Sequence, residues 1–474
     1  MHDVLIRNAL VLDGSDRPGR HGDVALRDGR IAAVGAVAGS ARQVIDADGR
    51  ALAPGFIDVH THDDLEVLRN PDMASKLSQG VTTVVVGNCG ISASPVRIRG
   101  EVPDPMNLLG EAGDFRFADF ASYRQAVEAA RPAVNVAALV GHTALRQNHM
   151  DRLDRAASAG EIAAMRAQLR ESLAQGALGL SSGLAYGSAF HAPPGEVAEL
   201  ARELPAGGLY ATHLRDEFGG ILEALDEAFD AARAPRAAVR VSHLKCAGID
   251  NWGRSREVLR RLDYASAGQD VACDCYPYAA SASTLDLKQV TDAYDILITW
   301  SEAEPAQGGR LLADIAAGWG VPLMEAAIRL QPAGAVYHCM DEADVRRILA
   351  HPLTMIGSDG LPRDPRPHPR LWGTFPRVLG HYARDAALFP LHTAVHKMTG
   401  LPAARFALGA RGAIRAGACA DLVLFDPARV RDTASFHDPI RAAEGIDAVW
   451  VNGTLAYDGS EVLARPGQFI TPTN

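Results

Sequence analysis

The sequence predicts an α/β protein built on a (β/α)8 (TIM) barrel, with an inserted segment at its mouth and a small β-rich domain built from both chain termini. Two observations predict this arrangement. Short apolar segments alternate with segments of helical period over roughly 350 residues, the pattern expected of a barrel of parallel strands. The two ends of the chain instead carry strand-like pieces interrupted by Gly and Asp, such as VLIRNALVLDG and IDAVWVNGTLAYDG.

The chain has 474 residues, which exceeds the length of a single ordinary domain. We expect residues 1–54 and 410–474 to form the small β domain together. Residues 55–409 then form the barrel, which is inserted between the two halves of the small domain.

Eight predicted strands are short and apolar, and most of them end in polar residues. They cover residues 55–62, 81–88, 135–142, 176–183, 209–215, 239–245, 270–278 and 354–360. Because the active sites of such barrels gather at the carboxyl ends of the strands, functional residues are expected at these strand ends.

The segments between the strands fit helices. Residues 161–175, for example, place Ile162, Met165, Leu169 and Leu173 on one helical face. The last two strands lie much further apart than the others. We therefore expect residues 284–345 to be an insertion over the mouth of the barrel.

Composition excludes several classes of partner. The formal net charge of −10 and the pI of about 5.9 argue against nucleic acid and anionic membranes as partners. The sequence has no signal-peptide pattern and no run of about 18 apolar residues. The six cysteines lack a disulfide-framework pattern, so we expect a cytoplasmic protein with reduced thiols.

Potential metal ligands stand at the ends of the predicted strands. In APGFIDVHTHDD, His60 and His62 follow an apolar strand and, two residues apart, point to the same face. Imidazole is the commonest protein ligand for zinc-like metals. One such pair would be weak support, but four further candidates stand at other strand ends: Cys89, His213, His243 and Asp359. The six residues together indicate a hydrolase that uses a divalent metal.

These motifs resemble those of the amidohydrolase superfamily and, within it, the N-acyl-D-amino-acid deacylases (D-aminoacylases). The resemblance extends over nearly the whole chain. The matching segments are PGFIDVHTHDD, GVTTVVVGNCGIS, GLSSGLAYG, THLRDE, SHLKC, CYPY, IGSDG and RPHPRLWGTFPRVLG. The cysteine after the second strand and the last of these segments are specific to this branch.

The resemblance implies zinc as the cofactor, with one tightly bound ion and a second, weaker ion. Cys89 and His213 would hold the tight ion, and His60, His62 and His243 would surround the weaker site. Many relatives bridge two metals with a carboxylated lysine on the fourth strand. The fourth strand here, GALGLSSG, contains no lysine, and a thiolate at the second strand takes its place. A single buried cysteine, taken alone, would be interpreted as a small apolar core residue.

Asp359 is implied as the catalytic general acid and base. It would accept a proton from the attacking water and pass it to the leaving amine. An Asp beside Gly is also common in turns, and this motif alone leaves that alternative open.

The implied substrate is an N-acyl-D-amino acid, whose α-carboxylate requires cationic or hydroxyl donors in a buried site. The resemblance assigns this role to Lys245, Tyr276 and Ser283, and places Arg370 close to the reaction centre. Without the resemblance, Lys245 and Arg370 would be interpreted as surface charges.

The substrate side chain is expected to contact the insertion. Deacylases that select acidic substrates carry an arginine near the segment that here includes Leu297. A leucine at this position favours neutral or apolar D-side chains such as Leu, Met or Phe. Lys288 is close in sequence and would favour an acidic side chain instead. Other expected lining residues are Leu184 or Tyr186, Tyr337 and Met340.

Three alternatives remain beside this hypothesis. The first is an N-acyl-D-glutamate or N-acyl-D-aspartate deacylase. The second is a cyclic-amide hydrolase of the hydantoinase type, which ordinarily needs the lysine that is missing here. The third is a non-enzymatic barrel, although such proteins usually lose metal ligands that this chain retains. The sequence leaves the oligomeric state open.

Overall fold

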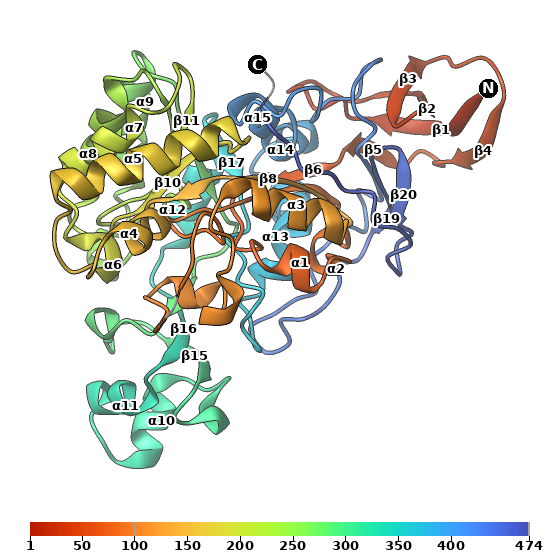
Figure 1. The fold of residues 1–474 in the computed structure, drawn as a ribbon. Coiled ribbons are helices and arrows are strands. Elements are labelled where there is room, and N and C mark those ends of the chain that lie inside the picture. Colours follow the sequence, from red (N-terminus) through yellow and green to blue (C-terminus); the bar gives the residue numbers. More distant parts are fainter. Residues whose placement is uncertain (99, 473–474) are drawn as a thin grey trace.

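A mixed sheet combines the two ends of the chain (Figure 1). The computed structural model describes residues 1–98 and 100–472. In this eight-stranded sheet the order is β20-β19-β18-β5-β1-β2-β3, and β4 pairs with β1 in parallel. The strands are β1 (His2–Val11), β2 (Arg20–Arg27), β3 (Arg30–Gly35), β4 (Ala41–Asp46), β5 (Ala51–Pro54), β18 (Leu422–Phe425), β19 (Ile446–Val451) and β20 (Thr454–Tyr457). Ile6, Leu52 and Trp450 belong to the separate apolar core of this sheet.

Parallel strands form the centre of the molecule in two hydrogen-bonded ladders, β6-β7-β8 and β17-β13-β12-β11-β10-β9. The strands are β6 (Phe56–Asp58), β7 (Val81–Val86), β8 (Asn135–Ala138), β9 (Val140–Gly141), β10 (Gly179–Gly183), β11 (Leu209–His213), β12 (Ala238–Val241), β13 (Val271–Cys275) and β17 (Thr354–Ile356). Each predicted strand overlaps one of these elements, and the third contains both β8 and β9. Among the described residues the ladders do not close into one hydrogen-bonded ring.

Two contacts connect the first and last of these parallel strands. Thr61 forms an isolated parallel bridge with Gly360. The amide of Asp359 donates to the carbonyl oxygen of His60 at 2.7 Å. The segments that follow β6 and β17 therefore lie side by side, as the placement of functional residues at strand ends requires.

Several strands end earlier than the sequence pattern predicts. β6 ends at Asp58, two residues before His60, and β17 ends at Ile356, three residues before Asp359. Cys89, His243 and Asp359 adopt left-handed backbone conformations, with φ of 54°, 35° and 50°. Such a conformation is unfavourable for side chains with a Cβ and interrupts ladder pairing, so it persists only where surrounding contacts impose it.

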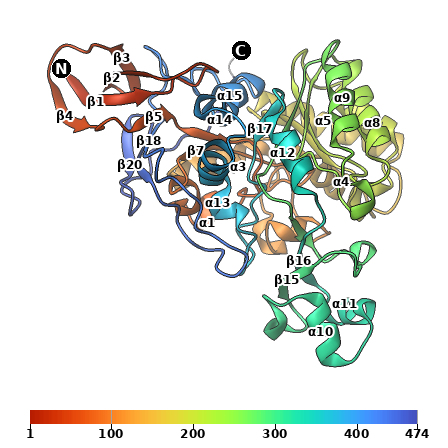
Figure 2. The same cartoon turned by 180° about the vertical axis from the view of Figure 1, so that it is seen from behind.

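Helices cover the outer face of the parallel strands (Figures 1 and 2). They are α1 (Glu66–Arg69), α2 (Ala74–Leu77), α3 (Phe120–Ala130), α4 (His142–His149), α5 (Ala159–Ala174), α6 (Gly187–Phe190), α7 (Pro194–Ala201), α8 (Ile221–Arg233), α9 (Ser255–Ser266), α12 (Glu342–Ala350), α13 (Arg370–Arg377), α14 (Leu391–Met398) and α15 (Gly400–Arg405). A π-helical segment, Val378–Asp385, continues α13. In α5, Ser158 caps the first turn through Glu161, and Met165 and Leu169 are buried as the sequence predicts.

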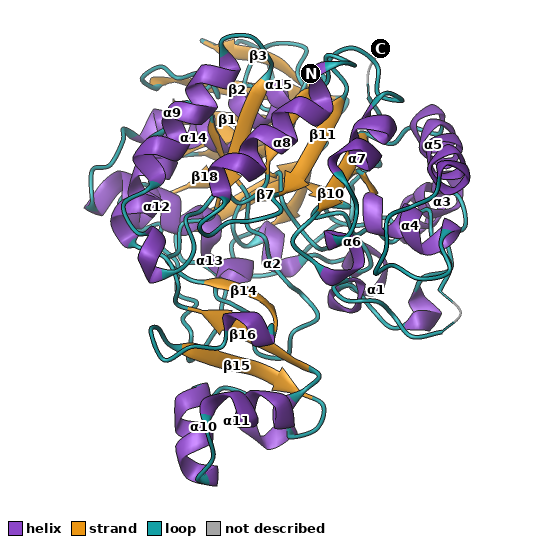
Figure 3. Ribbon diagram, turned by 90° about the vertical axis from the view of Figure 1, so that its left-hand side faces the viewer, coloured by secondary structure: helices purple, strands orange, loops and turns teal. Residues whose placement is uncertain are grey.

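A small antiparallel sheet projects from the main body together with two helices (Figures 1 and 3). Its order is β14-β16-β15, and it begins at Ser281, three residues before the predicted insertion. Its elements are β14 (Ser281–Thr284), β15 (Ile296–Ser301), α10 (Leu312–Trp319), α11 (Leu323–Leu330) and β16 (Ala333–Tyr337). Asp364 holds this sheet to the segment after β17, because it accepts hydrogen bonds from Thr299 and Trp300 at 3.2 and 3.0 Å.

No helix among the described residues is sufficiently long and apolar to cross a membrane.

Candidate metal centre and active site

Four of the six predicted ligands form one buried cluster. The Sγ of Cys89 lies 3.2 Å from His60 Nε2 and 3.3 Å from His243 Nε2. Asp359 Oδ1 lies 3.5 Å from His60 Nε2. One donor atom from each of these four residues lies within 4.8 Å of the others, so a single ion could contact all of them.

The cluster favours ionised donors. Burial would raise the pKa of the Cys89 thiol, but His60 and His243 outweigh this effect and hold it well below its usual value. Burial also opposes ionisation of Asp359. The positive charge of Arg370, with smaller contributions from His243 and His60, outweighs this effect of burial. The pKa of this carboxyl is therefore well below its ordinary range. Two anionic donors therefore face imidazoles inside the protein, an environment that a cation would stabilise.

His62 and Arg370 each contact a different carboxylate oxygen of Asp359. His62 Nε2 lies 3.2 Å from Oδ1, and Arg370 Nη1 lies 3.0 Å from Oδ2. Arg370 is fully buried, and its Nη2 donates to the carbonyl oxygen of Ala282 at 3.1 Å. The interpretation of Arg370 as a surface charge is therefore wrong, and its guanidinium connects Asp359 to β14.

His213 and Lys245 lie beside the cluster and share one carboxylate. Glu217 Oε1 lies 2.6 Å from Lys245 Nζ and 3.0 Å from His243 Nδ1, and its Oε2 lies 3.6 Å from His213 Nε2. Lys245 is only 6 % exposed, so the alternative of a surface charge is wrong for it too. The hydroxyl of Tyr186 lies 3.4 Å from His213 Nδ1, which places that candidate lining residue at the metal centre.

Both buried cations lie close to the ring of Tyr276. Arg370 stands over its ring at 4.6 Å and Lys245 at 5.9 Å. Its hydroxyl is buried and has no hydrogen-bond partner among the described residues, so it is free to donate to a ligand. Met340 lines a small cavity together with Lys245 and Tyr276.

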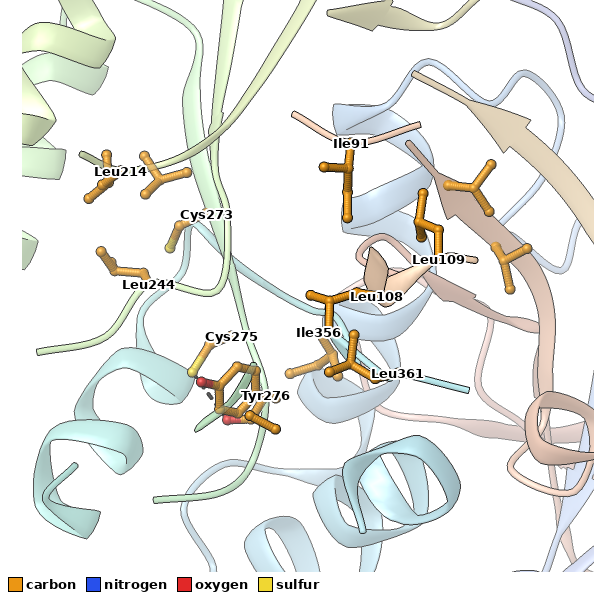
Figure 4. Close-up of a cluster of buried hydrophobic side chains, with 14 of the residues drawn as sticks. Ile91, Leu108, Leu109, Leu214, Leu244, Cys273, Cys275, Tyr276, Ile356 and Leu361 are labelled. Atoms are coloured by element: carbon orange, nitrogen blue, oxygen red, sulfur yellow. Dashed lines mark hydrogen bonds between the residues drawn. The ribbon is translucent and has the colours of Figure 1, made fainter. Parts of the chain in front are cut away.

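Buried apolar side chains gather near Tyr276 and on the segments that carry site residues (Figure 4). Leu214 and Leu244 each follow a histidine of the site, and Ile356 and Leu361 flank Asp359 in sequence. All four side chains are buried. An apolar enclosure strengthens electrostatic interactions within the site because it keeps water away from them.

The structure does not bring three predicted substrate residues to the cluster by any described side-chain contact. Ser283 and Leu297 pair with β16 through the backbone. The hydroxyl of Tyr337 donates to Thr284 O at 2.9 Å and accepts from Asp286 N at 2.8 Å. Its polar end is therefore used within the insertion, and a direct role in substrate binding stays a prediction. Leu184 is part of the core.

Two carboxylates of the site were not predicted from the sequence. Asp274 Oδ2 lies 3.3 Å from His60 Nδ1, and its Oδ1 accepts from the amide of His243 at 2.9 Å. Glu217 contacts three functional candidates. The alternation of β13 could have indicated Asp274, because its neighbours Cys273 and Cys275 point the opposite way. Glu217 follows a strand in irregular chain, so its sequence position carries no comparable signal.

A buried lysine beneath the centre was missed as well. Lys76 Nζ lies 2.9 Å from Asp58 Oδ2, 3.1 Å from Asp63 Oδ2 and 3.1 Å from the hydroxyl of Ser358. The side chains of the lysine and both aspartates are 0 % exposed. Lys76 thus joins the segment that carries His60 and His62 to the segment that carries Asp359.

The donor set fits zinc. Thiolate and imidazole are the donors that zinc-type ions prefer, with a carboxylate as a common additional ligand. His60 and His243 each use their second ring nitrogen to contact a carboxylate, Asp274 and Glu217 respectively. This arrangement is typical of metal-binding histidines, whose orientation and tautomer depend on such contacts.

Comparison with known proteins shows the family of this chain. The family model for the amidohydrolase family matches residues 43–457. The chain belongs to the amidohydrolase family. It is 52 % identical to the D-aminoacylase of Alcaligenes xylosoxydans xylosoxydans, over 95 % of this chain and 93 % of that protein. It is 50 % identical to the N-acyl-D-aspartate deacylase of the same organism, over 99 % of this chain and 95 % of that protein.

Two solved deacylase structures are similar to this chain over nearly its whole length. A crystal structure of D-aminoacylase superimposes with a TM-score of 0.97 at 50 % identity and covers 99 % of this chain and 100 % of that one. The N-acyl-D-glutamate deacylase of Bordetella bronchiseptica, in complex with zinc and a phosphonate inhibitor, gives 0.94 at 46 % identity, with 99 % of each chain covered. The L-hydantoinase of Arthrobacter aurescens gives 0.62 at 19 % identity over 99 % of this chain and 100 % of that one, which shows a shared fold alone.

Proposed function

We propose that this amidohydrolase hydrolyses the amide bond of N-acyl-D-amino acids with the help of zinc, and releases a carboxylate and a free D-amino acid. One observation carries the proposal. The thiol of Cys89 lies between His60 and His243 and beside Asp359, where the sequence has no lysine on the fourth strand. The D-aminoacylase and the N-acyl-D-aspartate deacylase that resemble this chain each match it over nearly its whole length.

Cys89, His213, His243, His60 and His62 would hold the metal, with one tight ion and a second, weaker one. Bound zinc would lower the pKa of water toward about 7 and polarise the scissile carbonyl. The protein supplies the enclosure, the second contacts of the histidines and the proton-transfer group.

Asp359 is the proposed general base and general acid. Its pKa is held well below the ordinary value, so it is ionised and able to accept a proton from water at neutral pH. His62 and Arg370 fix its two oxygens, which keeps the carboxylate oriented toward the cluster. The proton that it takes up then passes to the nitrogen of the leaving amine.

Lys245, Tyr276, Ser283 and Arg370 are the proposed contacts for the substrate α-carboxylate. Lys245 and Arg370 are buried cations close to the ring of Tyr276, whose hydroxyl has no partner among the described residues. A carboxylate that enters an apolar site needs such donors, because an unpaired buried charge costs several kcal/mol or more.

We propose neutral or apolar substrate side chains, with Leu297, Tyr337 and Met340 of the insertion region as contributors to the pocket. An acid-selective deacylase is the second candidate, and one observation favours it. Lys288 Nζ lies 5.3 Å from the ring centroid of Phe190, which Arg215 approaches from 5.9 Å, so two cations stand near α6. The two relatives differ by only two percentage points in identity, and identity does not separate these candidates.

We propose the following architecture and location for the protein. Residues 55–409 would form one (β/α)8 barrel with the insertion at 284–345, and residues 1–54 and 410–474 a small β domain. The bridge between Thr61 and Gly360 supports closure of the barrel, and the mixed sheet supports the small domain. We propose a cytoplasmic location from the composition, because the six cysteines lack the pattern of a disulfide framework.

A substrate panel tests the function. Purified protein loaded with zinc is assayed with N-acetyl-D- and N-acetyl-L-amino acids and with hydantoins. We expect turnover of the D-series and little or none of the other two. Turnover of hydantoins, or of L-substrates alone, would contradict the proposal, and zinc binding without turnover of any compound would favour a non-enzymatic role.

A further inference from the structure

We propose that Glu217 is a positioning residue that selects the metal-binding tautomer of His243 and holds Lys245 in place for the substrate. The inference deepens the proposed function and rests on it. Glu217 stands four residues after His213, in the irregular segment beyond β11, and its side chain is only 11 % exposed. It turns back toward the strand ends and contacts two proposed metal ligands and one proposed substrate contact.

The ring of His243 has two nitrogen atoms with different surroundings. Nε2 faces the Sγ of Cys89 at 3.3 Å, on the side of the ligand cluster. Nδ1 faces Glu217 Oε1 at 3.0 Å and Lys245 Nζ at 2.8 Å. A neutral imidazole carries one hydrogen, so these contacts cannot all be satisfied in the same tautomer.

Glu217 and Lys245 favour opposite tautomers of His243. A carboxylate only accepts, so the contact with Glu217 requires hydrogen on Nδ1 and leaves a lone pair on Nε2. An ammonium only donates, so a hydrogen bond from Lys245 to Nδ1 would place the hydrogen on Nε2. A nitrogen that bears hydrogen cannot bind a metal, and only the tautomer favoured by Glu217 presents a ligand to the cluster.

Glu217 also forms an ion pair with Lys245. Its Oε1 accepts from Lys245 Nζ at 2.6 Å, the shortest of its contacts. This ion pair restrains a flexible four-carbon side chain beside Tyr276 and draws its hydrogens away from His243 Nδ1. One carboxylate thereby prepares the metal centre and the α-carboxylate contact together.

Glu217→Gln is the primary test because it preserves the shape of the side chain. An amide can accept from Nδ1 or donate to it, so it favours neither tautomer. Zinc is titrated into the metal-free protein in competition with a chelator. We expect the affinity of the weaker zinc site, which includes His243, to fall by about 10- to 100-fold, as is typical when such a contact is lost. At saturating zinc we expect KM to rise while kcat stays within a few-fold of wild type. An affinity within two-fold of wild type would overturn the proposal.

The double variant E217Q/K245M distinguishes tautomer selection from a merely structural effect. Methionine cannot donate to Nδ1, so removal of Lys245 removes the competing contact. We expect the double variant to bind zinc more tightly than Glu217→Gln alone. If Lys245→Met in that background leaves zinc affinity unchanged or lowers it further, tautomer competition is wrong.

Asp216→Asn is the matched control. Asp216 accepts from the amides of Phe218 and Gly220 at 2.6 and 3.3 Å, and so shapes the same segment without a described contact to the cluster. It should bind zinc like wild type; an equal loss of affinity would assign the effect to the segment and overturn the proposal. Because the titration involves no substrate, its result is independent of whether N-acyl-D-amino acids are the substrate.

Discussion

At the scale of single residues, the site depends on unusual local conditions. Cys89, His243 and Asp359 all adopt left-handed backbone, and each is buried. Strain of this kind costs about 1–3 kcal/mol per residue and persists only where many contacts impose it. The site therefore consists of side chains that the fold holds in directions that an ordinary strand would not allow.

We predict that Cys89→Ala loses tightly bound zinc and activity together, because the thiolate is the anionic donor shared by His60 and His243. Metal content after dialysis and turnover of an N-acetyl-D-amino acid are the measurements. Cys273→Ala is the control. It removes another buried thiol, whose pKa burial raises to about 12, and it should retain zinc. Stoichiometric zinc and normal turnover in Cys89→Ala would disprove this model of the site.

Asp359→Asn is expected to keep most of its zinc and to lose kcat by about 10²- to 10⁴-fold, the usual effect of removing a general acid and base. The kcat is measured at saturating substrate alongside metal content. Asp364→Asn is the control. It removes another buried carboxyl of the same loop, one that contacts Thr299 and Trp300, and its kcat should fall far less. A kcat within a few-fold of wild type in Asp359→Asn would exclude it from proton transfer.

At the scale of elements, buried charges connect segments that lie far apart in the chain. Lys76 extends from α2 to Asp58 of β6, to Asp63 and to Ser358 after β17. Asp364 connects the same post-β17 segment to β15 of the insertion. The segment that carries Asp359 is thus held on two sides, by the first parallel strand and by the inserted sheet.

We expect Lys76→Met to lower the free energy of unfolding by about 3–5 kcal/mol, because it leaves two fully buried carboxylates without their cation. Urea denaturation measures the change. Arg202→Met is the control: its ion pair with Glu199 is 3.3 Å long but the arginine side chain is 57 % exposed, so the change should stay within about 0.5 kcal/mol. Equal effects of the two substitutions would show that the buried network adds nothing to stability.

The inserted sheet carries Leu297, which we expect to set the preference for the substrate side chain. With Leu297 on β15, the protein should prefer N-acetyl-D-leucine, D-methionine or D-phenylalanine over N-acetyl-D-glutamate by roughly 10²-fold in kcat/KM, since an apolar pocket leaves a substrate carboxylate unpaired. Leu297→Arg should raise activity on the acidic substrate. Met324→Arg is the control. It adds the same charge on α11, a helix of the projecting insertion (Figure 3), and should not raise activity on the acidic substrate.

A preference of the wild-type protein for N-acetyl-D-glutamate or N-acetyl-D-aspartate would contradict this expectation. Lys288, beside Phe190, would then be the cation to test next.

At the scale of the whole molecule, the proposed metal ligands come from the segments that follow β6, β7 and β12 and from the last residue of β11. An ion that binds them stabilises the folded protein, because the unfolded chain does not bring these residues together. The terminal sheet has its own core and contributes no residue to the cluster.

We therefore predict that zinc raises the unfolding free energy, by about 4 kcal/mol when free zinc is 1,000 times its dissociation constant. Thermal unfolding with and without zinc measures the effect, and Cys89→Ala should show little of it. A midpoint that does not change with zinc in the wild-type protein would contradict binding to the folded centre.

The sequence by itself determined the approximate positions of the parallel strands and most members of the candidate metal cluster. Apolar runs that end in His, Cys or Asp are local signals, and parallel strands bring their carboxyl ends to one edge without further information. His60, Cys89, His243 and Asp359 could thus be predicted to meet. The resemblance to the deacylases added Lys245 and Arg370, which local patterns alone would have assigned to the surface.

Only the tertiary structure decided which charges are buried and which partners they contact. Asp274, Glu217 and Lys76 contact partners 13 to 282 residues away in the chain or act from irregular segments, where no periodicity predicts the direction of a side chain. The same holds for Tyr337, whose hydroxyl bonds within the insertion. Periodicity records which face of an element is apolar, whereas the partner of a buried charge depends on how distant elements pack against one another.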